Sequence, residues 1–252
     1  GQVVISGMGE LHLEIVVDRL LREFGIRARI GNPQVAYRET VSRRAEGENR
    51  FVRTAGGPGG PRGEYGHVQL VVEPTDRGGG YVYENRASVS DIPSEHAPAV
   101  EAGIAEAVER GVLAGHPMTD LRVQVVGGSY HPVDSNNYAF KVAGAKAFVA
   151  AAATAGPILL EPVMSLEVTT PDEYVGDVLG DLHARRGKVA GITARPGVQT
   201  VACFVPMATM FGYATDLRSR TRGRATYAME LDHYAELPHQ LRDELMSRRA
   251  RA

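Results

Sequence analysis

The chain has 252 residues and a mass of 27.1 kDa, a length that allows one large domain or two to three small ones. Its formal net charge of −2 gives no global polycation that would indicate nucleic-acid binding, and no apolar run approaches the roughly 20 residues of a membrane span. The single cysteine, Cys203, excludes a disulfide framework and a multi-cysteine zinc site, and it suits a reducing, cytoplasmic compartment. Composition therefore indicates a globular protein and argues against disordered, collagen-like and transmembrane classes.

The first 33 residues read as an incomplete domain. A short apolar run at 3–6 predicts a strand, residues 10–24 carry apolar side chains at helical spacing, and residues 26–30 alternate like a strand. Gly25 is placed to end the helix. About 30 residues are too few for a stable core, so we expect this segment to have lost its other half and the chain to be a piece of something longer.

Residues 34–156 are predicted to form a second region with two long loops. The first loop, 53–66, is too rich in glycine and proline for a helix or a central strand, and the second covers 127–136. We expect Ser94 to cap a helix that Gly111 ends, and a later helix to pack small residues against a sheet. The predicted strands are 67–73, 81–83 and 121–126, and the predicted helices are 95–110 and about 137–154.

Residues 157–235 are predicted to form a third region with the order β-α-β-β-α-β, the split ferredoxin-like arrangement. Thr170 to Glu173 resemble a capping box with proline at the first helical position, and Gly187 is placed to end that helix. A basic amphipathic tail follows from about Leu237 to Arg251. The predicted strands are 160–169, 188–194, 198–205 and 225–231, and the second helix covers about 207–219.

Motifs for catalysis or cofactor binding are missing from the sequence. There is no GxxxxGK[ST] phosphate loop, no HExxH, no GxSxG and no carboxylate-rich calcium loop. Cys203 lies in the alternating strand VQTVACFVP, which favours a buried structural thiol. We therefore expect this chain to be no enzyme by itself and to hold no metal or cofactor.

The two loops carry groups that suit RNA. Exposed glycine amides, guanidinium groups and an aromatic ring in the first loop can contact phosphates and bases, although a solvated hairpin tip would show the same composition. In the second loop Tyr130, His131 and Asp134 precede a helix N-terminus, which favours anions. The alternative is a capped turn in which Asp134 or Ser135 binds backbone amides.

Positive charge is concentrated between residues 183 and 224. Eight basic residues stand there against one acid, Asp216, whereas a solvated face would mix both signs. The density of arginines therefore favours an anionic partner such as RNA phosphates over a merely solvated surface. The basic residues are Arg185, Arg186, Lys188, Arg195, Arg218, Arg220, Arg222 and Arg224.

Several long strings resemble translation elongation factor G, in the order in which that family has them. They are SGMGELHLEIVVDRLLREF (6–24), PQVAYRET (33–40), YGHV (65–68), GSYHPVDSN (128–136), LLEPVMSLEVTTPDEYVGDVLGDLHARRG (159–187) and VPMATMFGYATDLRSRTRGRATYAMELDHY (205–234). The resemblance covers nearly the whole chain and corresponds to the C-terminal half of the factor. It implies the end of domain III at 1–33, domain IV at 34–156, domain V at 157–235 and a helical tail at 236–252.

The resemblance implies an α+β, multidomain fold. Domain IV would be like domain 2 of ribosomal protein S5, domain V ferredoxin-like, and domain III a partial ferredoxin-like domain. The family promotes GTP-dependent translocation of tRNA and mRNA, with GTP and Mg²⁺ bound in a domain upstream of this chain. The implied partner is the ribosome, through rRNA of both subunits and the tRNA–mRNA duplex at the decoding centre, and we expect a cytoplasmic monomer.

The resemblance also implies which residues contact RNA. Those at the decoding centre would be Arg53, Gly56, Gly57, Arg62, Tyr65 and His67 in the first loop, and Ser129, Tyr130, His131, Asp134 and Ser135 in the second. Those at large-subunit rRNA would be Arg185, Arg186, Phe211, Tyr213, Arg218, Arg220, Arg222 and Arg224.

Both loops depart from the family pattern. Thr54 and Ala55 replace a glutamine–serine pair, Pro-Gly-Gly-Pro at 58–61 reads as an insertion, Pro132 replaces an acidic residue, and Asn136-Asn137 replace serine–glutamate. Three functions therefore stay open. The chain could belong to a translocase, to a paralogue or ribosomal protection factor that acts on drug-bound or stalled ribosomes, or to a stand-alone sequestration module without a GTPase.

Overall fold

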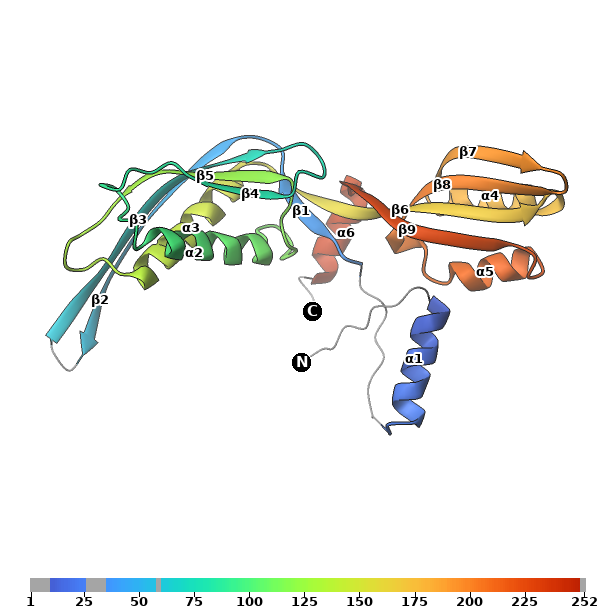
Figure 1. Ribbon diagram of the computed structural model, residues 1–252, viewed down its shortest axis with the longest axis horizontal. Helices are drawn as coiled ribbons and strands as arrows, with labels where there is room; N and C mark the ends of the chain where they lie inside the picture. Colours follow the sequence, from blue (N-terminus) through green and yellow to red (C-terminus); the bar gives the residue numbers. More distant parts are fainter. Residues whose placement is uncertain (1–9, 26–34, 58–59, 250–252) are drawn as a thin grey trace. The chain divides into compact units, whose positions relative to one another are not determined.

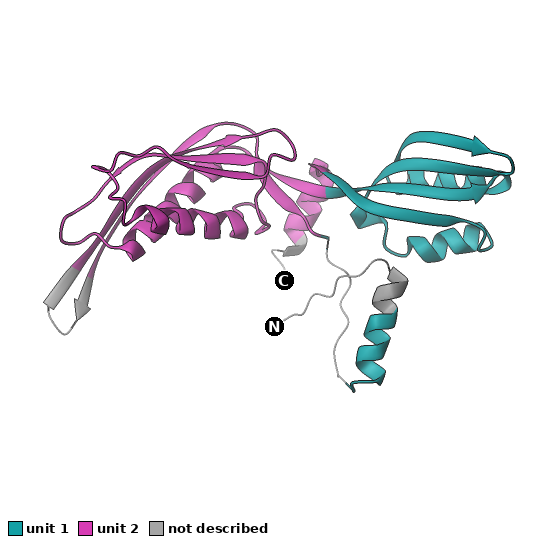
Figure 2. Cartoon of the chain, viewed as in Figure 1, with its two compact units in different colours: residues 1–35, 162–233 teal, residues 36–161, 234–252 magenta. Residues whose placement is uncertain are grey.

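The computed structural model describes residues 10–25, 35–57 and 60–249, and Figure 1 shows their helices and strands. The chain falls into two compact units, which Figure 2 colours separately. Unit 1 comprises residues 1–35 and 162–233, and unit 2 comprises residues 36–161 and 234–252. Each unit has a hydrophobic core of its own.

Unit 2 is built on a four-stranded sheet with two helices on one face (Figure 1). The strand order is β2-β3-β5-β4, and all neighbours are antiparallel except β4 and β5. The strands are β2 (Ala45–Gly57), β3 (Gly60–Pro74), β4 (Tyr81–Asn85) and β5 (Leu121–Ser129), and the helices are α2 (Ala97–Arg110) and α3 (Asn137–Thr154).

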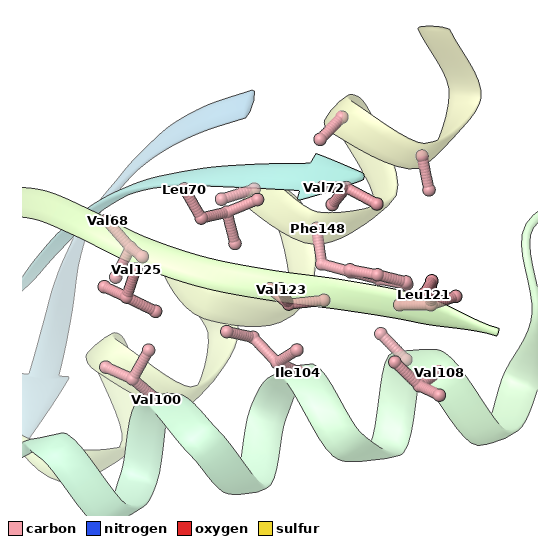
Figure 3. Packing of buried hydrophobic residues seen from close by; sticks show 14 of the residues in the cluster. Val68, Leu70, Val72, Val100, Ile104, Val108, Leu121, Val123, Val125 and Phe148 are labelled. Atoms are coloured by element: carbon pink, nitrogen blue, oxygen red, sulfur yellow. The ribbon is translucent and has the colours of Figure 1, made fainter. Parts of the chain in front are cut away.

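The core of unit 2 lies between this sheet and the helices, as Figure 3 shows. Alternate residues of β3 and β5 point into it, which is the period of two expected for a sheet with one covered face. Residues four apart on α2 meet them from the other side. The labelled core side chains are Val68, Leu70, Val72, Val100, Ile104, Val108, Leu121, Val123, Val125 and Phe148.

Helix α3 approaches the sheet closely because its inner face consists of small residues, as predicted. Ala147 and Ala151 are fully buried. A Cβ atom on Gly47 of β2 would lie 2.3 Å from the Ala147 carbonyl oxygen, and one on Gly66 of β3 would lie 2.6 Å from the Ala139 carbonyl oxygen. These two glycines therefore fix how the β2–β3 hairpin lies against α3.

Unit 2 also contains a short strand pair and a C-terminal helix. Strand β1 (Arg38–Val41) pairs with the first residues of β6 (Pro157–Pro171), and α6 (His239–Arg249) follows strand β9 (Thr226–Glu236). A small second core forms around Leu159 and Leu237, against which Leu241 and Leu245 of α6 pack. The predicted C-terminal helix is therefore present, and apolar side chains of it are packed.

Unit 1 has the strand order β9-β6-β8-β7, which confirms the predicted ferredoxin-like arrangement and the α+β class. Its core consists of apolar residues from β6 and β8 and from the two helices, and it includes Cys203, as predicted. Burial raises the pKa of the Cys203 thiol. The remaining elements are β7 (Lys188–Arg195), β8 (Val198–Pro206), α4 (Val175–Ala184), α5 (Tyr213–Arg220) and the 3₁₀ turns η1 (Asp172–Tyr174) and η2 (Met207–Thr209).

Helix α1 (Glu10–Arg22) confirms the helix predicted near the start of the chain. It ends three residues before Gly25, whose φ of +61° is left-handed. The strands predicted at 3–6 and 26–30 lie outside the described residues. No helix within the described ranges is both long and apolar enough to cross a membrane.

The prediction of a long irregular loop at 53–66 is wrong, because β2 and β3 stay paired out to Gly57 and Gly60. Strand β5 pairs with β3 only from His67 onward. The outer part of the hairpin is therefore a two-stranded ribbon, whose strand β3 is bridged to the second loop at Tyr65. Glycine and Pro61, which would disrupt a central strand, are tolerated in such a ribbon. The second loop is also shorter than predicted, since β5 runs to Ser129.

Three helix ends differ from the prediction. Helix α2 begins after His96, not Ser94, with a proline in its first turn. No side chain caps η1 or α4, because Thr170 is buried within β6. Helix α4 ends at Ala184, and Arg186 rather than Gly187 takes the left-handed conformation, with a φ of +66°.

Gly187 takes part in ending α4, as predicted, because its N–H donates to the Leu182 carbonyl oxygen over 2.8 Å. A Cβ atom there would lie 2.7 Å from that oxygen and 2.8 Å from the Cys203 sulfur. Glycine at this position therefore fits both the turn after α4 and the close approach of the chain to the unit 1 core.

Candidate nucleic-acid interface

The hairpin register places polar and aromatic side chains on the face of the sheet away from the helices. Arg50 pairs with His67 across β2 and β3, and Val52 pairs with Tyr65. His67 in turn pairs with Ser129 of β5. Because paired residues in a sheet project to the same side, the three strands present these side chains together.

Four polar side chains on this face form a continuous hydrogen-bonded chain, namely Tyr65, Ser129, His67 and Glu48. The Tyr65 hydroxyl lies 2.7 Å from Ser129 Oγ, which lies 2.8 Å from His67 Nδ1. His67 Nε2 lies 2.8 Å from Glu48 Oε1. Every proton has a partner if Tyr65 donates to Ser129, Ser129 donates to Nδ1 and Nε2–H donates to the carboxylate. The nearly buried His67 ring thereby fixes the Tyr65 ring, and the Arg50 guanidinium lies 5.8 Å from the centre of that ring.

The second loop, residues 130–136, is closed by its own polar groups. The His131 N–H donates to Ser135 Oγ over 2.9 Å, and the Ser135 N–H donates back to the His131 carbonyl over 3.1 Å. The Asp134 N–H donates to His131 Nδ1 over 3.1 Å. His131 Nδ1 also lies 3.3 Å from Asp134 Oδ2, so backbone and side-chain groups of the loop hold the Nδ1 edge of the ring. Half of the His131 side chain and most of Val133 remain exposed.

Backbone contacts join the two loops into one surface. The Tyr65 N–H donates to the Asp134 carbonyl over 2.8 Å, and the Tyr65 and His131 rings are 6.4 Å apart between centroids. A Cβ atom on Gly63 would lie 2.4 Å from Asp134 Cγ, so a larger residue there would displace the Asp134 carboxylate. We call the exposed parts of Tyr65, Tyr130 and His131 the tip surface.

A polar pocket of about 330 Å³ lies beside the tip surface. His96 forms part of its wall, stacked on Phe140 with a centroid distance of 4.9 Å and bonded through Nδ1 to Asn137 Oδ1 over 2.6 Å. Tyr130, His131 and Pro132 line the other side.

The structure divides the first-loop residues predicted to contact RNA. Tyr65 and His67 lie on the face of the sheet away from the helices. Arg53 lies on the face toward the helices, and its side chain is exposed to solvent. Gly56, Gly57 and Arg62 belong to the paired ribbon, where Ala55 pairs with Arg62. The exposed first-loop aromatic is therefore supported by strand pairing rather than by an irregular loop.

The capped-turn alternative for the second loop is confirmed for Ser135, whose Oγ accepts the His131 N–H over 2.9 Å. Asp134 lies against Gly63. The N-cap of α3 is a different residue, Asn136, whose side chain accepts the Ala139 N–H over 2.8 Å.

In unit 1 two predicted RNA contacts are core residues. Arg185 is 12% exposed, and its guanidinium binds Asp181, Asp216 and the Thr209 carbonyl oxygen while lying 5.1 Å from the Tyr213 ring centre. Tyr213 is 1% exposed, and burial raises the pKa of its hydroxyl. These side chains stabilise unit 1 and leave nothing to offer an RNA, which differs from the prediction for both.

The other basic residues of unit 1 fall into two groups. Arg220 lies 3.3 Å from Asp181, and Arg224 lies 2.8 Å from Glu173. Arg218 and Arg222 are exposed and have no ion pair among the described residues. Lys188 and Arg195 on β7 are exposed in the same way. Phe211 is partly exposed, and Arg186 holds the turn after α4.

Sequence reasoning missed Glu48, which contacts His67 behind the tip surface, and Asn136, which caps the helix that follows the second loop. Glu48 is two residues from Arg50 on the same face of β2, but that spacing has meaning only once 53–66 is recognised as a hairpin. The described residues contain no group of three or more His, Cys, Asp or Glu that could hold a metal ion.

Comparison with known proteins identifies three consecutive parts of one family. Residues 1–32 match the model of elongation factor G domain III, residues 33–156 match domain IV, and residues 158–245 match the elongation factor G C-terminus. None of these three models is a GTP-binding domain. A crystal structure of a protein from Thermus thermophilus aligns with 98% of this chain at 40% identity and a TM-score of 0.86. This chain spans only 36% of that protein's length. The chain therefore belongs to the elongation factor G family of translation factors, of which it comprises part of domain III, domain IV and the C-terminal domain.

Proposed function

We propose that this chain is the ribosome-binding part of an elongation factor G that promotes GTP-dependent translocation of tRNA and mRNA. In this proposal GTP and Mg²⁺ bind to a part of the factor outside this chain. The observation that carries it is the tip surface, in which two loops are joined by the Tyr65–Asp134 backbone bond and His131 is held at its Nδ1 edge. The match to domain IV over residues 33–156 supports the same assignment.

The geometry suggests how the tip surface would act on RNA. With its Nδ1 edge held by the loop, the His131 ring would use Nε2–H as one directional donor to a 2′-hydroxyl, a phosphate oxygen or a base acceptor. The Tyr65 ring beside it offers a stacking face, held in place by Ser129, His67 and Glu48. A surface held by internal hydrogen bonds loses little entropy on contact, so it can support moved RNA against backward slippage.

Unit 1 would supply a second, electrostatic contact with large-subunit rRNA. Arg218 and Arg222 carry charges that no carboxylate among the described residues neutralises. Phosphate contacts of this kind weaken as salt is raised and are easily released, which suits a factor that binds and leaves the ribosome in each cycle.

The first test replaces His131 in the intact factor. We expect His131→Ala to slow single-turnover translocation at least about tenfold while ribosome affinity stays within about twofold, since the lost donor is worth roughly 1.5 kcal/mol or more. Rapid kinetics of mRNA movement and ribosome pelleting give the two values.

A matched variant separates the outward donor from loop closure. His131→Asn keeps a side-chain acceptor for the Asp134 N–H but does not reach outward to the position of Nε2. We expect this variant to be as slow as His131→Ala. Equal losses of translocation and affinity in both variants would contradict the assignment of the tip surface.

A second candidate function is protection of drug-bound or stalled ribosomes by a paralogue of the same ancestry. It is favoured by Pro132, which lines the pocket beside His131 and stiffens the exposed loop. Incubating the intact factor with tetracycline-stalled ribosomes and measuring drug release distinguishes the two. Release with slow translocation would favour protection, and fast translocation without release would favour the translocase.

A further inference from the structure

A second aromatic cluster lies on the opposite side of the hairpin from the tip surface. Phe51 of β2 and Tyr138 of α3 pack with their ring planes at 81° and a centroid distance of 6.0 Å. The Lys146 ammonium lies 5.5 Å from the centre of the Phe51 ring. We call Phe51, Tyr138 and Lys146 the α3 platform.

The platform is both supported and open. Phe51 is half-buried and contacts both other members, so it holds the Tyr138 ring and the Lys146 ammonium in one cluster. Tyr138 nevertheless keeps 53% of its surface exposed, and Lys146 is exposed as well. An aromatic ring and an ammonium group are thereby presented together at the surface, with Phe51 as their shared support.

The charge of the platform is not neutralised within the protein. Lys146 has no carboxylate within ion-pair distance among the described residues, whereas Lys141, earlier on the same helix, is paired with Glu106 over 2.6 Å. Residues 137–154, which form α3, contain no acidic side chain. Arg53, two residues beyond Phe51 on the same face of β2, is opposite Glu64 of β3 and adds no net charge to this surface. The positive charge of the platform therefore comes from Lys146, beside an aromatic ring.

This combination selects one class of partner. An apolar protein surface would leave Lys146 desolvated and unpaired, which is costly. An unpaired RNA segment satisfies both features, because its bases stack on aromatic rings and its phosphates take the charge.

We propose that the α3 platform binds an unpaired RNA segment, with a nucleobase stacked on Tyr138 and the adjoining phosphate on Lys146. This contact is separate from the tip surface, whose residues lie on the other face of the hairpin. It does not depend on the translocase assignment, since it requires only that the chain meets single-stranded RNA.

The direct test uses tryptophan as a reporter, because the chain contains none. Tyr138→Trp in the 252-residue chain places the only indole on the platform, and we expect a short oligouridylate to quench its fluorescence by stacking. Leu231→Trp is the matched control. Leu231 is also 53% exposed, but Glu230 and Asp232 flank it and repel RNA, so we expect no quenching there.

Affinities then separate stacking from charge. We expect Tyr138→Leu to weaken oligouridylate binding at least about fivefold, the low end of what stacking contributes, and Tyr138→Phe to stay within about twofold. Lys146→Met should lower the slope of log affinity against log salt by about 0.7, as for one phosphate contact on a single strand. Circular dichroism of each variant shows whether it is folded.

Three outcomes would overturn the proposal. They are equal quenching in Tyr138→Trp and Leu231→Trp, unchanged affinity in a folded Tyr138→Leu, and loss of ribosome binding in Tyr138→Leu without any effect on oligouridylate. The last result would assign the platform to a protein surface. The tip variant His131→Ala should leave the quenching unchanged, so a failure of the translocase proposal and a failure of this one give different results.

Discussion

The polar residue that most strongly organises unit 2 is Glu39 of β1, which is fully buried. Its Oε2 accepts the N–H groups of Val112 and Leu113 over 2.7 and 2.8 Å. Its Oε1 accepts those of Ala114 and His116 over 2.7 and 2.9 Å. A carboxylate that accepts four backbone donors replaces water for the whole turn that follows α2, which is why the charge can be buried there.

We expect Glu39→Gln to destabilise unit 2 by about 3 kcal/mol or more. The amide has the same shape but turns one acceptor into a donor that faces two backbone N–H groups, so two charge-assisted hydrogen bonds are lost. Urea unfolding followed by circular dichroism measures the change.

The matched control for this variant is Glu109→Gln on α2. It makes the same chemical change on an exposed side chain. We expect it to alter the free energy of unfolding by less than about 0.5 kcal/mol. Similar losses in the two variants would show that the buried hydrogen bonds of Glu39 are not what stabilises the turn.

At the scale of elements, sequence patterns predicted the parts that depend on local periodicity. The helices α2 and α3 and the β7–β8 hairpin around Gly197 lie where their spacing and turn residues placed them. The outer hairpin was mispredicted, because glycine and proline report on backbone preference and not on pairing with a partner strand. The N-terminal caps predicted at Ser94 and Thr170 are also not formed, because tertiary packing decides which residue precedes the first helical turn.

The same distinction applies to the basic segment of unit 1. Its arginines look alike in the sequence, but Arg185 is enclosed by two carboxylates and Tyr213, while Arg218 and Arg222 project from α5 and the turn after it. Only the fold separates structural arginines from those available to a ligand, because the separation depends on which carboxylates lie within about 4 Å.

We expect Arg218→Gln with Arg222→Gln to lower the salt slope of ribosome binding by between about one and two, one phosphate contact for each lost charge. Binding titrations of the intact factor at several salt concentrations give the slope. Arg224→Gln is the control from the same segment. Its charge is already paired with Glu173, so its slope should stay close to that of the unchanged factor.

At the scale of the molecule, the two units have separate cores, one around Val123 and Phe148 and one around Leu166 and Val201. We therefore expect two unfolding transitions in scanning calorimetry. Glu39→Gln should lower the midpoint temperature of the unit 2 transition by several degrees and leave that of unit 1 unchanged. A single transition that moves as a whole would show that the units unfold as one cooperative body.

Membership of the family was evident from the sequence because long strings match in order, whereas the individual roles of residues were not. The resemblance named His131, Tyr65 and Ser129 as a group. It could not show that Ser129 links Tyr65 to His67, or that His131 Nδ1 is occupied by the loop, since both depend on the strand register and on loop closure.

Gly47 and Gly66, which lie against α3, determine how the β2–β3 hairpin can be lengthened. Because Gly47 and Gly66 anchor the hairpin at its base, residues added in pairs beyond Gly57 and Gly60 would extend the ribbon by about 3.3 Å per pair without shifting the register below. The length of the hairpin can thus change at its tip while its base keeps the same position against α3. A series of chains with hairpins of increasing length would measure how deep the binding site is that the hairpin enters. Natural relatives can differ in hairpin length while keeping the same residues at its base.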